Sequence, residues 1–111
     1  MRDPHAIRPC SYLINDEVIA FASERVALMT TFGVDADEIQ ELEPAHLATV
    51  KHNGSHEIRP FTETKKRASC SFERIYFSRG NDHEIYQERK ALGAALREQI
   101  YKAVDNDLSN T

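Results

Sequence analysis

Residues 10–28 read CSYLINDEVIAFASERVAL, in which two short apolar segments are followed by a run with helical spacing. Asn15 and Asp16 separate the two segments, and both residue types tolerate the positive φ values of a two-residue hairpin turn. A turn at these residues predicts two cross-strand pairs, Tyr12 with Ile19 and Leu13 with Val18. Apolar residues then occupy both faces of the hairpin, which predicts that it is covered on two sides within a sandwich.

A helix is predicted immediately after this hairpin. Ser23 is expected to be its N-cap and Gly33 to end it. Its apolar residues are Val26, Ala27, Leu28, Met29 and Phe32. The next segment, residues 34–43, is acidic and has Ile39 and Leu42 as its large apolar residues.

A second antiparallel hairpin is predicted around Asn53-Gly54, a dipeptide typical of a tight turn. Its strands are residues 46–52 and 55–61, and a two-residue turn pairs residue 52 with 55 and residue 51 with 56. His52 and His56 then point to opposite faces of the ribbon. We therefore expect exposed turn histidines here, not a pair of metal ligands.

The last part of the chain is predicted to be a polar linker followed by helices. Residues 62–69 contain Lys65-Lys66-Arg67, which predicts a solvated segment; contact of this basic triplet with a phosphate is the alternative. From Phe72 onward the spacing of the apolar residues favours a short helix. A long amphipathic helix at about 83–105 carries an apolar stripe, Ile85, Leu92, Leu96, Ile100 and Val104.

The composition is typical of a soluble globular protein. The 111 residues are 41% apolar and 29% charged, with a mean hydropathy of -0.56, and they suit one domain or part of one. No apolar run approaches the roughly 20 residues of a membrane-spanning helix. Fourteen Lys and Arg against 18 Asp and Glu give a net charge of -4, so we expect neither a membrane nor a nucleic acid as partner.

The cysteines and the motif search give no complete active site. Cys10 and Cys70 form neither a CxxC motif nor a disulfide framework, so we expect a reducing, cytoplasmic setting. The predicted hairpin places Cys10 opposite Phe21 as a small buried hydrophobe. The sequence holds no GxSxG, GxGxxG, Walker A or HExxH motif. From the residues alone we predict an α+β fold of antiparallel β hairpins and helices that ends in a long amphipathic helix.

Two motifs in the first third resemble a known family. Residues 2–9 read RDPHAIRP and residues 21–28 read FASERVAL. They are similar to the RDPxGIRPL stretch and the ASE helix cap of class II glutamine amidotransferases, whose domain is an N-terminal-nucleophile (Ntn) α/β/β/α sandwich. Asparagine synthetases carry similar motifs, so this third of the chain is compatible with both.

The second half resembles the amidophosphoribosyltransferases. Residues 70–79 read CSFERIYFSR and are followed by Tyr86-Gln87-Glu88-Arg89 and Gly93. This is similar to the CxFExxYFxRPDS…VYxxRxxxG junction between the glutamine domain and the phosphoribosyltransferase domain of that family. The chain departs from the family pattern at three places: Ala6 replaces the glycine of xGIRP, Pro44-Ala45-His46 replaces PGE, and RGND at residues 79–82 replaces RPDS.

The resemblance implies a domain organisation and a reaction. Residues 1–64 correspond to the C-terminal part of a class II glutamine amidotransferase domain, residues 65–80 to a linker and short helix, and residues 81–111 to the first helix of a phosphoribosyltransferase-type domain. In this family an N-terminal cysteine attacks the glutamine amide. The ammonia then displaces pyrophosphate from phosphoribosyl pyrophosphate, held with magnesium, to give the phosphoribosylamine of purine biosynthesis.

The glutamine-site residues of the family lie upstream of the RDP motif. We therefore expect the 111-residue chain to be an inactive interior fragment, with no catalytic, glutamine-binding or metal-binding residue and no cofactor of its own. Some family members hold an iron–sulfur cluster, and one of its ligands matches Cys70. The apolar stripe of the helix at about 83–105 would pack on the missing domain, so its exposure predicts self-association.

Two other interpretations stay open at the level of sequence. The chain could be a standalone interaction module that docks a partner through its C-terminal helix. It could also belong to another class II amidotransferase, such as an asparagine synthetase.

Overall fold

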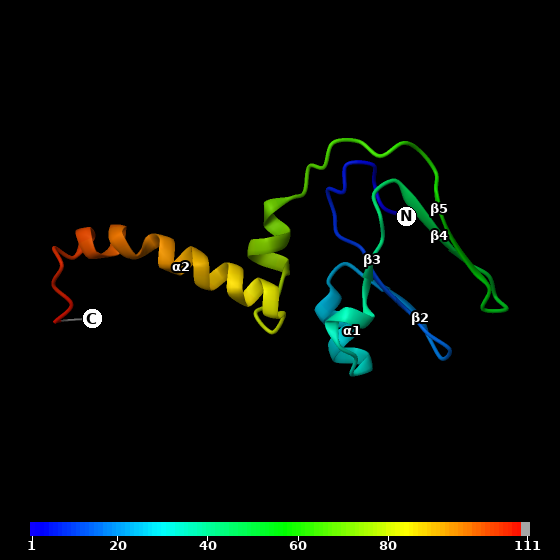
Figure 1. The fold of residues 1–111 in the computed structure, drawn as a ribbon, viewed down its shortest axis with the longest axis horizontal. Coiled ribbons are helices and arrows are strands. Elements are labelled where there is room, and N and C mark those ends of the chain that lie inside the picture. Colours follow the sequence, from blue (N-terminus) through cyan, green and yellow to red (C-terminus); the bar gives the residue numbers. More distant parts are fainter. Residues whose placement is uncertain (110–111) are drawn as a thin grey trace. The chain divides into compact units, whose positions relative to one another are not determined.

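The computed structural model describes residues 1–109, which divide into two compact units, residues 1–78 and a second unit that begins at Arg79. Antiparallel strands and short helices make up the first unit, and one long helix makes up most of the second (Figure 1). This confirms the prediction of an α+β chain with antiparallel hairpins and a C-terminal helix.

The first sheet has three antiparallel strands in the order β2-β1-β3. Strand β1 is Ser11–Ile14, β2 is Ile19–Ala22 and β3 is Gln40–Glu41. Helix α1, Arg25–Phe32, packs against β1 and β2. Leu13 of β1 and Val26 and Leu28 of α1 are all buried, so these two elements supply part of the apolar core of the first unit.

The first hairpin forms, but its register differs from the predicted one. Strands β1 and β2 pair Tyr12 with Phe21, Leu13 with Ala20 and Ile14 with Ile19. The predicted pairs of Tyr12 with Ile19 and of Leu13 with Val18 are therefore wrong, as is the placement of Cys10 opposite Phe21.

The position of Asn15 explains the change of register. Its N–H donates to the carbonyl oxygen of Val18 at 3.1 Å, and its side-chain Oδ1 accepts from the N–H groups of Glu17 and Val18. Asn15 is therefore the first residue of the turn, which its side chain closes, and not a central residue. Its φ is not positive, so the predicted turn conformation is wrong as well.

Helix α1 starts one residue later than predicted and ends where predicted. Its N-cap is Glu24, in extended backbone and without a capping side-chain bond, so the expected cap at Ser23 is wrong. Gly33 has φ 66 and donates its N–H to the carbonyl oxygen of Met29 at 2.9 Å. A glycine adopts this left-handed conformation without steric cost, which is why the helix ends here.

A short 3-10 turn, Ala36–Glu38, labelled η1, leads into β3. Leu42 follows β3 and is fully buried, as its role as an apolar anchor predicted. The N–H of Leu42 donates to the carbonyl oxygen of Cys10 at 2.8 Å. This bond extends the pairing of β3 with the β1 side of the sheet.

Strands β4, His46–Val50, and β5, His56–Pro60, form the second hairpin. Val50 pairs with His56, so the predicted two-residue turn is wrong by one position. The N–H of Lys51 donates to the carbonyl oxygen of Ser55 at 2.8 Å, and the N–H of Gly54 donates to that of Lys51 at 2.9 Å. The loop therefore has three residues and ends on Gly54 at φ 82, a conformation that favours glycine.

A short helix near the end of the first unit confirms the prediction made from Phe72 onward. This helix, η2, spans Glu73–Phe77 and is a π-helix. The N–H of Ser78 donates to the carbonyl oxygen of Glu73 at 2.8 Å, which is the five-residue step of that helix type.

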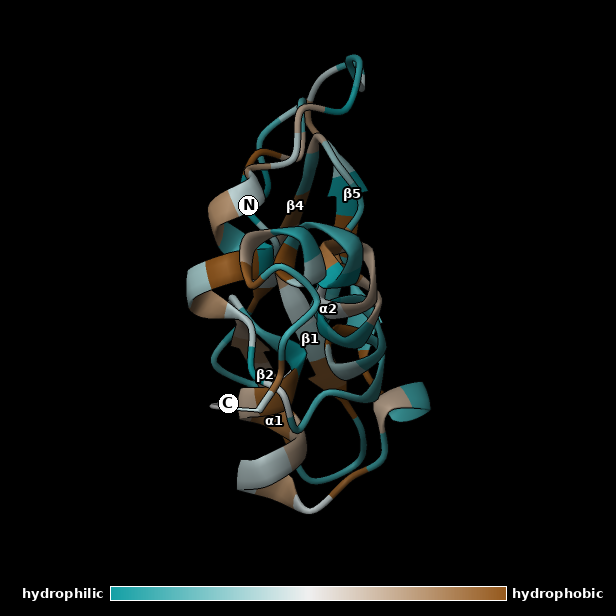
Figure 2. Cartoon of the chain, turned by 90° about the vertical axis from the view of Figure 1, so that its left-hand side faces the viewer, coloured by the Kyte–Doolittle hydropathy of each residue, from teal (hydrophilic) through white to brown (hydrophobic). Residues whose placement is uncertain are grey.

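The second unit contains α2, His83–Ala103, which confirms the long C-terminal helix. The Asp82 side chain caps it by accepting from the N–H groups of Glu84 and Ile85. Figure 2 shows hydrophobic residues interleaved with hydrophilic ones along α2. Of the predicted stripe, Ile85 is buried, whereas Leu92, Leu96 and Ile100 are 63%, 51% and 53% exposed.

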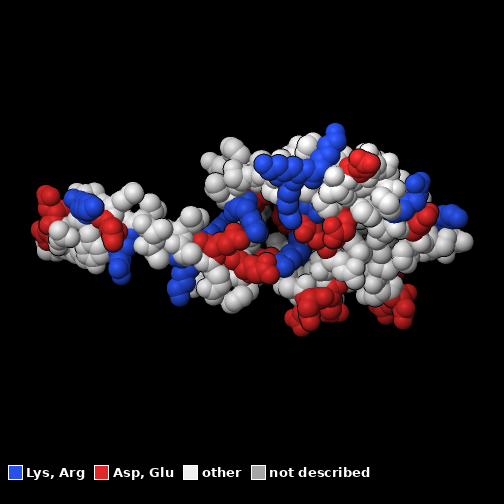
Figure 3. Space-filling view, turned by 45° about the horizontal axis from the view of Figure 1, so that its top comes forward, with Lys and Arg blue, Asp and Glu red and all other residues white. Residues whose placement is uncertain are grey.

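Two further observations concern the surface. On the face of residues 1–109 drawn in Figure 3, basic and acidic side chains lie next to one another. None of the helices within these residues combines the length and the apolar character needed to cross a lipid bilayer.

Candidate functional site

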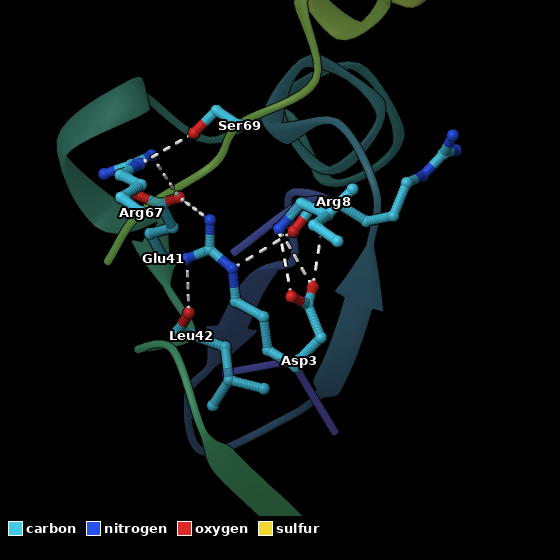
Figure 4. A network of polar contacts seen from close by, with 8 residues as sticks. Asp3, Arg8, Glu41, Leu42, Arg67 and Ser69 are labelled. Carbon is cyan, nitrogen blue, oxygen red and sulfur yellow. Dashed lines mark hydrogen bonds and ion pairs between the residues drawn. The ribbon is translucent and has the colours of Figure 1, made fainter. Parts of the chain in front are cut away.

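A buried arginine organises the polar centre of the first unit. The Arg2 side chain is 3% exposed, and its Nη2 lies 2.6 Å from Oε1 of Glu41. Its Nη1 donates to the carbonyl oxygen of Leu42 at 2.6 Å, and its Nε donates to that of Arg8 at 3.1 Å. Arg2 thus joins the amino-terminal segment to β3 and the residue after it (Figure 4). A buried charge needs such partners, because an unpaired one is costly.

The carboxylate of Asp3 shapes the loop that follows. It accepts hydrogen bonds from the N–H groups of His5 and Ile7 and from that of Arg8 (Figure 4). Partial desolvation acts to raise the pKa of the Asp3 carboxyl, but the bonds from Ile7, Arg8 and His5 outweigh it and hold that pKa below its ordinary value. Asp3 is therefore ionised at neutral pH and holds residues 3–8 in one conformation.

Residues 62–70 run beside the amino-terminal segment. The N–H groups of Lys65, Ala68 and Cys70 donate to the carbonyl oxygens of Pro4, His5 and Ile7, at 3.0, 2.8 and 3.1 Å. The Arg67 side chain donates to Oγ of Ser69 at 2.8 Å and lies 3.5 Å from Oε1 of Glu41. The Glu41 carboxylate therefore pairs with both Arg2 and Arg67 (Figure 4).

Arg8 connects the same loop to η2. Its Nη1 lies 2.8 Å from Oε1 of Glu73, whose side chain is 10% exposed. Its guanidinium carbon lies 5.1 Å from the ring centroid of Phe77. Within residues 1–109 neither carboxylate oxygen of Glu73 accepts a hydrogen bond, so the contact with Arg8 is an ion pair that is not aligned as a hydrogen bond.

Two of the departures from the family pattern fall on unusual backbone. Ala6, which replaces the glycine of xGIRP, has φ 50, and Ala45, which replaces the glycine of PGE, has φ 62. Both are buried, and the Asp3 carbonyl oxygen accepts from the N–H groups of both. Residues with a Cβ are disfavoured in the left-handed region. This conformation is therefore a physical reason why the family pattern has glycine at these two positions.

The residues singled out from the sequence are mostly not brought together. His52 lies in the loop of the second hairpin and His56 in β5, and both are exposed as predicted. Lys65, Lys66 and Arg67 are all exposed, as predicted, and Arg67 also lies 3.5 Å from Oε1 of Glu41. Residues 1–109 contain no group of three or more His, Cys, Asp or Glu side chains that could hold a metal ion.

The two cysteines are both free thiols. Cys10 and Cys70 are half-buried, so Cys10 is less enclosed than predicted. Cys70 is fixed by its backbone bond to Ile7.

Sequence reasoning missed the partners inside this polar network. Arg2, Asp3 and Arg8 belong to the RDPHAIRP motif and Glu73 to the CSFERIYFSR motif, but no spacing rule shows that the two motifs touch. The burial of Arg2 and Glu73 also runs against the rule that charged residues lie at the surface. A charged residue inside a recognisable motif was the available signal.

The chain is similar in sequence to three known enzymes. No family model matches the chain. It is 31% identical over 110 residues to the amidophosphoribosyltransferase of Bacillus subtilis, with 96% of the chain covered. It is 33% identical over 117 residues to that of Synechocystis sp., with 97% covered. For the amidophosphoribosyltransferase of Methanothermobacter thermautotrophicus, identity is 27% over 100 residues, with 86% covered. The chain spans 20–22% of the length of these curated relatives.

Proposed function

We propose, from the premise that the chain belongs to the amidophosphoribosyltransferase family, that it forms the junction of a two-site enzyme that transfers ammonia from glutamine to phosphoribosyl pyrophosphate. The observation that carries the proposal is similarity to three such enzymes along 86–97% of the chain. The contact between Arg8 and Glu73, from the two motifs that resemble the family, supports it. Residues 1–64 would close the glutamine domain, residues 65–80 would link it to the next domain, and residues 81–111 would begin that domain.

In this proposal the first sheet belongs to an Ntn sandwich. One face of the β1–β2 hairpin carries four large apolar side chains, those of Tyr12, Ile14, Ile19 and Phe21. Phe21 is 40% exposed, and its ring centroid lies 5.8 Å from that of Tyr12. An apolar face of this kind is suited to a second sheet, which the remainder of the glutamine domain would supply.

The proposed reaction has two halves. Water hydrolyses the glutamine amide to glutamate and ammonia by way of a cysteine thioester. The ammonia nitrogen then bonds to C1 of the ribose as the bond from C1 to pyrophosphate breaks. The residues of this chain take part in neither bond change; they hold the two halves of the enzyme together.

The groups that the family resemblance implies do not find a complete site here. For magnesium, residues 1–109 offer no group of three or more His, Cys, Asp or Glu side chains. An iron–sulfur cluster takes four ligands as a rule, and only Cys10 and Cys70 are present. The described residues alone do not fit such a cluster.

The test is to assay the protein expressed from its complete reading frame for pyrophosphate released from phosphoribosyl pyrophosphate. We expect release that depends on glutamine or on added ammonia. The 111-residue chain by itself is the comparison, and we expect it to form neither glutamate nor pyrophosphate above a blank.

Two results would refute the proposal. Asparagine formed from aspartate would assign the protein to the asparagine synthetases. A reading frame that yields no glutamine-dependent product of either kind would favour an interaction module. The exposed side chains of Leu92, Leu96 and Ile100 on α2 would then form its docking face.

A further inference from the structure

Three side chains meet at the end of the first unit. The Arg8 guanidinium lies between the Glu73 carboxylate, at 2.8 Å, and the face of Phe77, at 5.1 Å from the ring centroid. Glu73 and Phe77 are the first and last residues of η2. Arg8 therefore contacts both ends of this short helix, and the second unit begins two residues after it, at Arg79.

The backbone of Arg8 is itself held on both sides. Its N–H donates to Oδ2 of Asp3 at 3.4 Å, and its carbonyl oxygen accepts from Nε of Arg2 at 3.1 Å. Arg2 is in turn paired with Glu41 of β3. Because these bonds fix the backbone from which the Arg8 side chain extends, η2 is tied through Arg8 to the sheet of the first unit.

Stability alone does not account for the contact of Arg8 with Glu73. The Glu73 side chain is 10% exposed, and neither carboxylate oxygen accepts a hydrogen bond within the described residues. The Arg8 side chain is 58% exposed, and an ion pair with a solvent-exposed partner contributes only about 0–1 kcal/mol to stability. What such a pair does supply is a defined orientation of the Glu73 side chain, because Arg8 is the cationic side chain with which its carboxylate pairs within the described residues.

The short helix itself offers little rigidity. A π-helix is a rare element that occurs mostly as a single turn and frequently at functional sites. Phe72, Ile75 and Tyr76 are 56%, 59% and 65% exposed, so packing of these side chains within the first unit does not hold η2 in place. Arg8 supplies a side-chain contact at each end of η2, and the backbone bond from Cys70 to Ile7 ties the residues just before η2 to the same loop.

We propose that Arg8, Glu73 and Phe77 form a positioning clamp, which holds η2, the last element of residues 1–78, against the amino-terminal segment of that unit and so keeps ammonia release coupled to ammonia transfer in the whole protein. This inference rests on the proposed function. Ammonia must reach a second site before it escapes, and small errors in position cost such steps heavily. The clamp residues contact no substrate; they act by holding the exit of one unit.

The experiment compares variants of the complete protein. Glu73→Gln keeps the shape of the side chain and removes its charge. The double variant Arg8→Met with Glu73→Leu removes both charges at similar volume, so its folding stability should be preserved. Arg8→Lys keeps the charge without the flat face that lies over Phe77. Glu57→Gln is the matched control, because Glu57 is an exposed carboxylate 3.8 Å from Arg59.

The measured quantity is the pyrophosphate released per glutamate formed, together with the melting temperature. We expect this ratio to fall about tenfold in the double variant and in Glu73→Gln, with glutamate formation changed less than about twofold. We expect an intermediate ratio for Arg8→Lys and an unchanged ratio for Glu57→Gln. The melting temperature of the double variant should match that of the parent.

Each other outcome overturns a definite statement. An unchanged ratio in the double variant refutes the clamp and leaves the proposed function intact. A parallel loss of both half-reactions and of melting temperature shows a purely structural role and also refutes the clamp. If the unsubstituted protein releases no pyrophosphate with glutamine, the proposed function fails, and the clamp fails with it.

Discussion

At the scale of single residues, two alanines occupy backbone that suits glycine. Ala6 and Ala45 have φ values of 50 and 62, and their N–H groups both donate to the carbonyl oxygen of Asp3. The carbonyl oxygen of Asp3 thus accepts hydrogen bonds from two residues in the left-handed conformation that lie far apart in the sequence. The sequence showed that both positions depart from a family pattern, but only the backbone conformation explains why the pattern has glycine there.

This conformation predicts an unusual response to glycine. We expect Ala6→Gly to change the free energy of unfolding by less than about 0.5 kcal/mol, because relief of roughly 1–2 kcal/mol of backbone strain offsets the lost methyl group and the added chain entropy. The control is Ala27→Gly on the exposed side of α1, which should lower the free energy of unfolding by about 1 kcal/mol. Urea unfolding of the 111-residue chain measures both. A cost at Ala6 as large as that at Ala27 would contradict the interpretation.

Asp3 predicts a dependence of stability on pH. The folded state holds the pKa of Asp3 below its ordinary value, so the charged carboxylate stabilises the fold above about pH 4, and this contribution is lost as the pH falls through the folded-state pKa. We expect Asp3→Asn to lower the free energy of unfolding by about 1 kcal/mol at pH 7, and by less at pH 3. Urea unfolding at the two pH values is the measurement, with the exposed turn residue Asp16, changed to Asn, as control. Equal losses at both pH values would show that the charge of Asp3 is not involved.

At the scale of elements, the turn residues predicted both hairpins correctly but predicted the strand register of neither. Asn15 lies one position earlier in its turn than predicted because its side chain accepts from the N–H groups of Glu17 and Val18. In the second hairpin a third loop residue lets Gly54 take the left-handed position. Both strands of the first hairpin are apolar on their two faces, so hydrophobic alternation could not select the register.

Helices were more predictable than strands, for a physical reason. Gly33 and Asp82 lie at helix ends, where local backbone and side-chain bonds decide the boundary. The start of α1 was misplaced by one residue because Glu24, and not Ser23, is the N-cap. Local signals are sufficient for such elements, whereas sheet pairing depends on residues far along the chain.

The candidate site was the least predictable part. Its essential contacts join residues separated by long stretches of sequence, as Arg2 with Glu41 and Arg8 with Glu73 do. Nothing in spacing or composition relates such pairs, because the tertiary fold brings together residues that lie far apart in the sequence. The resemblance to a family marked the motifs, and the structure supplied the partners.

At the scale of the whole molecule, each unit leaves apolar surface uncovered. In the first unit the exposed side chains include Phe21, Phe72 just before η2, and Ile75 and Tyr76 of η2. In the second unit they include Leu92, Leu96 and Ile100 on α2. This fits a segment that spans 20–22% of the length of its relatives, because a segment of a larger protein would bury such surface against the remainder.

The stripe on α2 gives the last prediction. Exposed apolar area is unfavourable in water by about 25 cal/mol per Å², and residues 92, 96 and 100 follow one another at four-residue steps, so two copies of the helix can cover each other's stripe. We expect the isolated chain to sediment above its monomer mass of 12.7 kDa at high concentration. Leu96→Gln should shift it to the monomer, while Glu98→Gln, which lies off the stripe, should not. A monomer at every concentration, or equal association of both variants, would show that α2 does not provide the contact.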